Sequence, residues 1–547
     1  MQATRREVIK SFAALPLLRP GTGDPELVLY NGLVYTVHAA HPAATAIAVR
    51  DGRILAVGTD REMLSLAGKK TRRIDLARRR VLPGFNDAHA HPAESGLLQL
   101  SNVACDKTSI EDILASLRDR AAKTAPGHWV QGYLYDDGKT PRPLLRADLD
   151  AAVPDHPVLV AHRGGHTAYV NSLALTLAGV TATTPDPPGG RFEHGPDGQL
   201  NGRVADKAMD AVLGKIPNEL TREDHRRAVA VISKLYASYG VTSACEADAT
   251  PDHLQGYQDA RDSGELLYRA YCHMDVGYLD RYIAAGLHTG FGDSTVRIGG
   301  IKQFADGSIS ERTAWLAEPY IGLPNYYGVE SGTRESLYEN SRKAWLAGFQ
   351  LATHANGERA IDHMLGIYEQ LQREAPRRDP RFRLEHCTVV TPALVERIRA
   401  VGAIPIPFAG YVNFHGDVMH FYGDERNQRM FAYRWFIDAG LRPPASSDYT
   451  ASPPSPMLWL YSMTTRRDPR GHVWGPGQRI TLPEAVRSAT LDGAYASFEE
   501  HDKGSIEPGK LADLVVLEGD PFTLAEESWL DIKVERTLLG GRWVYES

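Results

Sequence analysis

The central region of the chain alternates short apolar strands with amphipathic helices, and this alternation constrains the fold more than any other feature of the sequence. The predicted helices are residues 110–122, 222–239 and 334–348, and the predicted strands are residues 158–160, 297–304, 349–353 and 403–407. Strands that alternate with helices over this length predict a parallel sheet or barrel. Residues 181–202 are rich in Gly, Pro and Asp and lack periodicity, so we expect a long loop within an insertion there.

Both ends of the chain are rich in strands instead. The predicted strands lie within residues 28–37, 46–57, 512–517, 534–539 and 543–545, and the predicted turns are Asn31-Gly32, Asp51-Gly52 and Gly540-Gly541. Each end alone is too small to bury a core. We therefore expect one small β-domain built from both termini, with two unrelated β appendages as the alternative.

Composition excludes several classes of protein. The chain has 61 Lys and Arg against 68 Asp and Glu, a net charge of −7, which argues against a generally basic nucleic-acid binder. No apolar run approaches the ~20 residues of a spanning helix, so we expect no integral membrane segment. The four cysteines form no Cys-x-x-Cys pair, which excludes a zinc knuckle of that type and disfavours a disulfide framework.

The first residues suggest a route out of the cytoplasm. Residues 4–10, with Arg5-Arg6, resemble a twin-arginine export signal, and a short apolar stretch follows at residues 11–18. That stretch contains Pro16, and no clean cleavage site comes after it. Export to the periplasm is the expectation for residues 1–24, and a basic tail on a cytoplasmic protein is the alternative.

Four histidines lie where strands are expected to end. His89 and His91 are two positions apart in a predicted strand, so both side chains can point to one face and converge on one metal ion. His354 and His386 each follow an apolar strand, where the active site of a (β/α)8 barrel is built. For each of them alone, a hydrogen-bonded structural histidine is the alternative.

Two further side chains fit metal chemistry. Asp448 follows a short run of small residues and could bind metal and accept a proton from water, or it could cap a turn. Lys302 lies within an apolar strand, where a lysine is costly unless it is paired or neutralised. Carbamylation by carbon dioxide would make Lys302 an anionic ligand able to bridge two cations. Alternatively, its ammonium reaches solvent or a carboxylate such as Asp306.

Eight segments in order resemble the amidohydrolase superfamily, and within it the amidohydrolase-3 group. They are LPGFNDAHAHP (82–92), GGHTAYVNSLAL (164–175), PPGGRF with DGQLNGRV (187–192, 197–204), IKQFADGS (301–308), THANGERAID (353–362), LEHC (384–387), SSDY (446–449) and GSIEPGKLADLVVLEGDP (504–521). The resemblance extends over nearly the whole chain from about Leu27. The order of the segments is specific for the family but not for a substrate.

The resemblance implies an α/β fold, a (β/α)8 TIM-type barrel with a small β-sandwich formed from both termini. We expect the sandwich at residues 25–82 plus 500–547 and the barrel at residues 83–499, with an insertion at about 125–215.

The resemblance also implies a metal centre. Its implied ligands are His89, His91, Lys302, His354, His386 and Asp448, with Lys302 carboxylated on Nζ to bridge two metals and Asp448 shuttling protons. The cofactor would be one or two divalent ions, with zinc expected. Four residues are expected near the substrate or behind the ligands: His166 from the insertion motif, Glu246 as a supporting or bridging carboxylate, Asp306 as a structural carboxylate, and Arg312 as a pocket residue.

The predicted activity is metal-dependent hydrolysis of an amide-type C–N bond in a small molecule, with a homodimer as the expected assembly. The alternatives are a deaminase or a cyclic amide or ester hydrolase on the same barrel, and a barrel that binds small molecules without catalysis. An oxidoreductase built of strands and helices is disfavoured because no Gly-x-Gly-x-x-Gly follows a predicted first strand.

Overall fold

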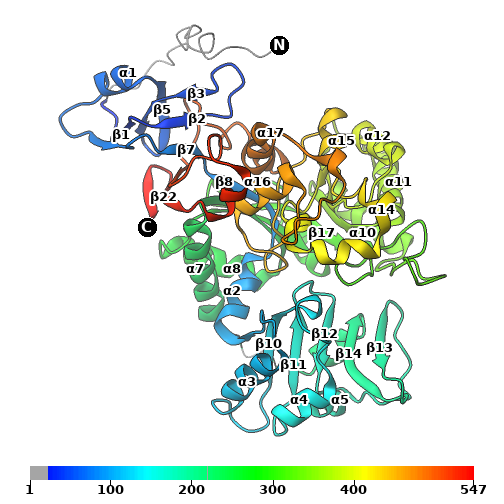
Figure 1. Ribbon diagram of the computed structural model, residues 1–547. Coiled ribbons are helices and arrows are strands. Elements are labelled where there is room, and N and C mark those ends of the chain that lie inside the picture. The colour runs from blue at the N-terminus through cyan, green and yellow to red at the C-terminus, as the bar shows by residue number, and fades with distance from the viewer. Residues whose placement is uncertain (1–22, 218–219) are drawn as a thin grey trace.

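The computed structural model describes residues 23–217 and 220–547 (Figure 1). The twin-arginine-like residues 4–10 lie outside the described residues, so export stays a prediction. Within the described part of the chain, no helix is both long enough and apolar enough to cross a membrane.

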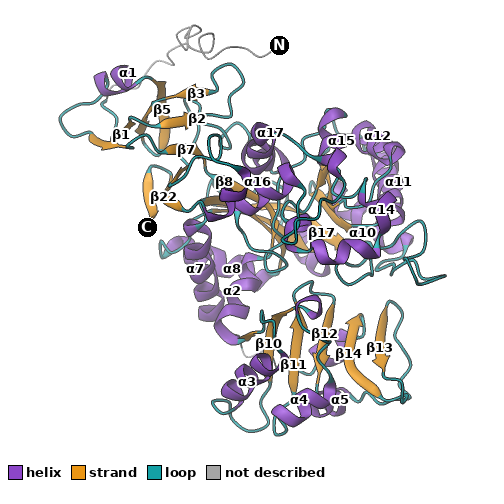
Figure 2. Ribbon diagram, viewed as in Figure 1, coloured by secondary structure: helices purple, strands orange, loops and turns teal. Residues whose placement is uncertain are grey.

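Seven parallel strands form the central sheet, whose edges curl toward each other. In spatial order they are β20 (Ala403–Ile406), β19 (Phe382–His386), β18 (Gln350–Ala355), β17 (Val296–Phe304), β16 (Arg269–Asp275), β15 (Val241–Ala249) and β8 (Phe85–Ala90). Helices lie around them, among them α7 (Arg222–Ser238), α8 (Pro251–Asp262), α10 (Arg334–Leu346), α11 (Glu358–Glu374) and α12 (Pro392–Val401) (Figure 2). Side chains on both faces of these strands are buried, and the buried set includes charged residues such as Asp87, Lys302 and Glu385.

Residues 445–448 connect the two edges of this sheet and close the barrel. Ala88 N donates to Ala445 O at 3.0 Å, and Asp448 N donates to His89 O at 2.8 Å, both at the β8 edge. At the other edge, Ala409 N donates to Ser446 O at 2.9 Å. The predicted barrel is therefore confirmed, with this short segment in the place of the eighth strand.

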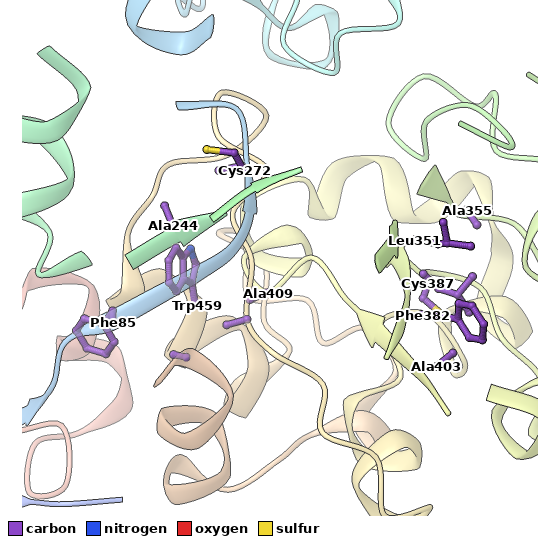
Figure 3. Close-up of a cluster of buried hydrophobic side chains, with 14 of the residues drawn as sticks. Phe85, Ala244, Cys272, Leu351, Ala355, Phe382, Cys387, Ala403, Ala409 and Trp459 are labelled. Carbon is purple, nitrogen blue, oxygen red and sulfur yellow. The ribbon is translucent and has the colours of Figure 1, made fainter. Parts of the chain in front are cut away.

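The barrel core is a continuous layer of apolar side chains between strands and helices. Figure 3 shows part of it, with Phe85 and Ala244 on one side and Leu351 and Phe382 on the other. All four cysteines are buried and free. They behave as small apolar side chains here, in agreement with the absence of a disulfide framework.

An insertion between α2 (Pro92–Ser101) and α7 forms its own mixed sheet. The sheet order is β13 (Gly190–His194), β14 (Leu200–Asp206), β12 (Thr167–Val170), β11 (Val158–His162), β10 (Val130–Tyr135) and β9 (Val103–Ala104). Helices α3 (Ile110–Ala121), α4 (Arg146–Ala152), α5 (Ser172–Ala178) and α6 (Met209–Leu213) accompany it. In Figure 1 the insertion is the separate cyan layer beneath the barrel.

The loop predicted for residues 181–202 is partly wrong. β13 and the start of β14 pair in an antiparallel ladder, with Phe192 opposite Val204, and both side chains are buried. The Gly and Pro residues of this stretch concealed the strand, because burial of Phe192 depends on a partner strand that the local pattern does not show.

The terminal segments form two sheets. One contains β5 (Arg53–Gly58), β4 (Ala46–Arg50), β1 (Leu27–Tyr30) and β6 (Arg72–Asp75); the other contains β23 (Arg542–Glu546), β22 (Val534–Leu539), β21 (Leu514–Leu517), β7 (Arg80–Pro83), β2 (Leu33–Tyr35) and β3 (Ala43–Ala44). β7 pairs with β21, so strands from both ends share a sheet, and the alternative of two unrelated appendages is wrong. Leu29, Val49 and Leu538 belong to one buried cluster.

The predicted turns had different outcomes. Asp51 and Gly52 have φ of 51° and 70° and join β4 to β5, which is the hairpin expected of them. The hairpin predicted at Asn31-Gly32 is wrong, because β1 pairs with β4 and β6 whereas β2 pairs with β3 and β7. These two residues instead carry the chain from one sheet to the other.

Candidate metal centre and substrate cavity

Three side chains meet at the carboxyl ends of the barrel strands. His89 lies in β8, His386 ends β19, and Asp448 is the last residue of the closing segment. One ligand atom from each lies within 4.8 Å of the others, and His89 Nε2 is 3.5 Å from Asp448 Oδ1. Imidazole nitrogen and carboxylate oxygen are donors that suit zinc and similar divalent ions.

The environment of His89 fits a metal ligand. Its Nδ1 lies 2.5 Å from Glu385 Oε2, whereas its buried Nε2 has no hydrogen-bond partner among the described residues. A carboxylate behind Nδ1 fixes the ring and leaves Nε2 as the ligand atom, which is the usual support of a metal-bound histidine. Buried polar atoms without a hydrogen-bond partner are rare, so the unpaired Nε2 that faces Asp448 supports a metal ion as its partner.

A buried arginine holds Glu385 in turn. Arg383 donates from Nε to Glu385 Oε1 at 2.6 Å and from Nη2 to Glu385 Oε2 at 2.9 Å. Arg383 Nη2 also donates to Ala88 O at 2.6 Å, next to His89 in the chain. Burial alone would raise the pKa of Glu385, but the Arg383 charge and hydrogen bonds outweigh it and lower that pKa. Glu385 is therefore an anionic partner for His89.

Asp448 also interacts with the second histidine of the His-x-His pair. His91 Nε2 lies 3.4 Å from Asp448 Oδ1. Burial raises the pKa of Asp448, but the hydrogen bond from His91 and the charges of nearby groups outweigh it and lower that pKa. Asp448 is therefore a carboxylate that can accept a proton.

His354 lies beside the three central ligand residues. Its ring centroid is 4.5 Å from that of His386, and both rings line one cavity. Its Nε2 is 3.1 Å from Gly307 O and 3.0 Å from Asn356 Nδ2. The structure thus brings His89, His386 and Asp448 together and places His354 in an adjacent position with local partners.

Lys302 is buried on β17 and lines the same cavity. Its Nζ has no hydrogen-bond partner in the part of the chain that the structure describes, and it lies 4.4 Å from the Phe304 ring centroid. Its charge is among the causes that lower the pKa of His89 and of His386, after burial. The alternative that Lys302 reaches solvent or pairs with Asp306 is wrong, because the residue is 1% exposed and forms no ion pair with that carboxylate.

Two ligand residues adopt unusual backbone conformations. His386 and Asp448 have φ of 69° and 52°, in the left-handed region that side chains rarely occupy. Asp87 holds the segment before Asp448 by accepting bonds from Ser447 N at 2.9 Å and Ser447 Oγ at 2.5 Å. Backbone strain that surrounding bonds maintain is frequent at functional sites.

Asp306 and Glu246 support neighbouring backbone. Asp306 accepts bonds from Asn356 N, Gly357 N and Trp315 N at 2.8 to 2.9 Å, so it shapes the loop that follows β18. Glu246 Oε2 accepts bonds from Ala93 N and Tyr257 OH, and its buried Oε1 has no partner within the described ranges. Burial raises the pKa of both carboxyls to about 7.

A cavity of about 450 Å³ lies over the ligand residues. Its polar lining includes His91, Asp248, Lys302, His354, His386, Asp448 and, from the insertion, His162, Arg163 and His166. Apolar walls come from both units, including Phe304, Phe408, Tyr411, Phe431, Leu159 and Met209. Arg312 does not line this cavity; it contacts the Phe421 ring and lines two neighbouring cavities.

The sequence interpretation missed Glu385, Arg383 and Asp87. Each of the two carboxylates precedes a predicted ligand in a motif, Glu385 beside His386 and Asp87 two residues before His89. That proximity was the available signal. Which histidine each carboxylate serves depends on the barrel, since Glu385 supports His89 and not its neighbour His386.

A second group of candidate ligands lies at the edge of the insertion. Asp136, Asp137 and His162 have ligand atoms within 4.8 Å of one another. Arg163 Nε lies 3.2 Å from Asp136 Oδ2, and Lys139 Nζ lies 3.8 Å from the same oxygen. Side-chain cations thus already neutralise this group.

Comparison with known proteins identifies the family of the chain. The model of the amidohydrolase family matches residues 72–545. The chain is 29% identical over 551 residues to Protein LONG AFTER FAR-RED 3 of Arabidopsis thaliana, with 98% of this chain and 94% of that protein covered. It is 27% identical to the N-substituted formamide deformylase of Arthrobacter pascens, with 95% and 98% covered.

The fold also occurs among solved structures. An uncharacterized metal-dependent hydrolase from Pyrococcus horikoshii matches with a TM-score of 0.75 and 24% identity, over 92% of this chain and 99% of that one. The protein belongs to the amidohydrolase family. It is a hydrolase of this class whose candidate metal site is formed by His89, His386 and Asp448.

Proposed function

We propose that the protein hydrolyses an amide-type C–N bond of a small molecule, with one or two divalent ions, preferably zinc, held by His89, His386 and Asp448. The observation that carries this proposal is the convergence of these ligand atoms around an orphaned buried nitrogen, His89 Nε2. His91, His354 and Lys302 are the further ligands of the proposed centre. The 27% identity to a protein named N-substituted formamide deformylase supports the amide bond as the target.

A divalent ion at this place would supply Lewis acidity, which polarises a carbonyl and lowers the pKa of water. Asp448 is the proposed proton shuttle. Its carboxylate accepts a proton from the water that attacks the amide carbon, and it returns this proton to the nitrogen as the C–N bond breaks. The products are a carboxylic acid and an amine, so the atoms of one water molecule are accounted for.

The surroundings of Asp448 prepare it for this role. His91 Nε2 is 3.4 Å from Asp448 Oδ1, so the two atoms can hold the same ion. The bonds from Ser447 to Asp87 fix the backbone that carries Asp448. The carboxylate is therefore oriented before substrate binds, which lowers the cost of reaching the reactive geometry.

We also propose that Lys302 is carboxylated on Nζ. An unpartnered ammonium that is 1% exposed is costly, and its conversion to a carbamate would remove the buried positive charge from a group of histidines. The modification adds carbon dioxide to the neutral amine with loss of one proton. Its oxygens would then be ligands beside His386 and Asp448.

The experiment that tests the function is a hydrolysis screen of zinc-reconstituted protein against N-formyl, N-acyl and cyclic amides. Released amine, ammonia and acid are measured separately, so that deamination is distinguished from amide hydrolysis. Asp448→Asn should retain at least part of the metal and lose about 10²–10⁴-fold in kcat. Near wild-type turnover by Asp448→Asn would refute the proton-shuttle role.

The Lys302 proposal has a test of its own. Protein prepared with ¹³C-bicarbonate should show a carbamate resonance that is absent from Lys302→Ala. The variant should bind less metal, and short carboxylic acids should restore part of it. Lys343→Ala is the matched control, since that lysine is 51% exposed. Unchanged metal stoichiometry in Lys302→Ala would overturn the bridging role.

A further inference from the structure

His166 reaches the cavity over the candidate metal site from the insertion and not from the barrel. It lies in the loop between β11 and β12 and lines the same cavity as Lys302 and Asp448. Its ring centroid is 5.5 Å from that of His354. The insertion therefore contributes a polar side chain directly beside the proposed reaction site.

Asp206 holds His166 by two hydrogen bonds, one to the ring and one to the backbone. His166 Nδ1 is 3.0 Å from Asp206 Oδ1, and Asp206 N donates to His166 O at 2.7 Å. A carboxylate accepts hydrogen bonds, so Nδ1 carries the proton in this pair. Nε2 makes no hydrogen bond that the structure records within residues 23–217 and 220–547, and it is the ring atom left for a molecule in the cavity.

The barrel fixes the same loop through Glu311. Glu311 Oε1 accepts from His162 Nδ1 at 2.7 Å, from Thr167 Oγ1 at 3.2 Å and from His166 N at 3.3 Å. The Glu311 side chain is only 2% exposed. One buried carboxylate of the barrel thus holds the insertion loop on both sides of His166. Such bonds fix the position of a side chain that contacts a ligand.

We propose that His166 contacts the substrate through Nε2, at the polar group next to the scissile bond, and that Asp206 positions the ring for this contact. The inference rests on the proposed hydrolytic function of the same cavity. The insertion would then take part in substrate recognition, because the loop that carries His166 belongs to it.

Two substitutions separate the ring atoms of His166. In His166→Asn the amide takes the approximate place of Nδ1 and can still bond Asp206, but nothing replaces Nε2. In His166→Gln the amide reaches the approximate place of Nε2 and can donate or accept. We expect His166→Asn to lose about 10²-fold in kcat/KM on the best amide of the screen, and His166→Gln to remain within about tenfold of wild type.

Metal content measured by mass spectrometry should be unchanged in both variants. His194→Asn is the control, because that histidine is an exposed residue of the same insertion. Asp206 is tested by rescue: Asp206→Leu should lower kcat about tenfold, whereas Asp206→Asn, which keeps an acceptor oxygen, should stay close to wild type. Equal activity of His166→Asn and wild type would overturn the proposal.

A chemical readout is independent of turnover. Diethylpyrocarbonate should modify His166 at its free Nε2, as located by peptide mass mapping, and acetohydroxamate, a small amide analogue that binds metal, should slow this reaction at least fivefold. Equal modification with and without acetohydroxamate would refute the contact. If wild type hydrolyses no amide in the screen, the proposed function fails, whereas the protection experiment still decides the role of His166.

Discussion

Replacing Glu385 by Gln is the sharpest test of how this site is built. Gln keeps the volume and one carbonyl oxygen but removes the charge between Arg383 and His89. The two charged side chains are 1% and 0% exposed, and two bonds of 2.6 and 2.9 Å join them. Loss of the charge leaves a buried guanidinium without an anionic partner.

The magnitude follows from that burial. Breaking a buried ion pair by neutralising one partner costs about 3–5 kcal/mol of stability. His89 also loses the anionic acceptor that lies 2.5 Å from its Nδ1. Loss of such a partner behind a metal-bound histidine lowers metal affinity by about 10–100-fold, or roughly 1.4–2.7 kcal/mol.

The assay uses two measurements on the same protein. Urea unfolding of the metal-free form, followed by tryptophan fluorescence and circular dichroism, gives the stability change. Zinc affinity comes from competition with a chromophoric chelator. Glu396→Gln is the matched control, because Glu396 is 62% exposed and pairs with Arg399 on the surface, where an ion pair contributes about 0–1 kcal/mol.

The expected result is a large shift in both measurements for Glu385→Gln and little change for Glu396→Gln. If Glu385→Gln matched the control in urea midpoint and kept its zinc affinity within twofold, the account of Arg383, Glu385 and His89 as one supporting chain would be refuted.

Three further predictions concern pH, domain docking and metal removal. Burial lowers the pKa of His162, but the carboxylates of Asp137 and Glu311 outweigh it and raise that pKa to about 9. The stabilisation that His162 contributes is therefore fully present below about pH 6.5 and is lost as pH rises toward 9. Over this pH range, the urea midpoint of His162→Gln should fall less than that of wild type. Asp513→Asn removes the carboxylate charge and one of the two acceptor oxygens that bond Arg269, a contact that joins the terminal unit to the barrel, and it should lower the melting temperature measured by calorimetry. Chelator dialysis should abolish hydrolysis, and zinc should restore it.

Each of these has a contradicting outcome. If the urea midpoint of His162→Gln fell as much as that of wild type between pH 6.5 and 9, the imidazole would not titrate as described. An unchanged melting temperature for Asp513→Asn would show that the ion pair does not hold the terminal unit. Full activity after metal removal, verified by elemental analysis, would refute the proposed chemistry.

Much of the fold was predictable because its signals are local. The helix over residues 110–122 and the strand over residues 297–304 follow from apolar spacing, and α3 and β17 lie there. The turn at Asp51-Gly52 follows from the positive φ that those residues tolerate. Residues 190–194 were predicted as loop because their strand depends on a neighbour, β14, and not on their own pattern.

The sequence by itself determined which side chains can bind metal and that they follow predicted strands, since residue type and strand periodicity are properties of short segments. The family resemblance grouped them in one barrel. Only the tertiary structure decided which of them meet. Closure of the barrel by residues 445–448 brings Asp448 to His89, and Glu385 supports a histidine 296 positions away. The insertion places His166 over the same cavity. Such contacts are set by strand order and packing across the whole chain, which no local pattern contains.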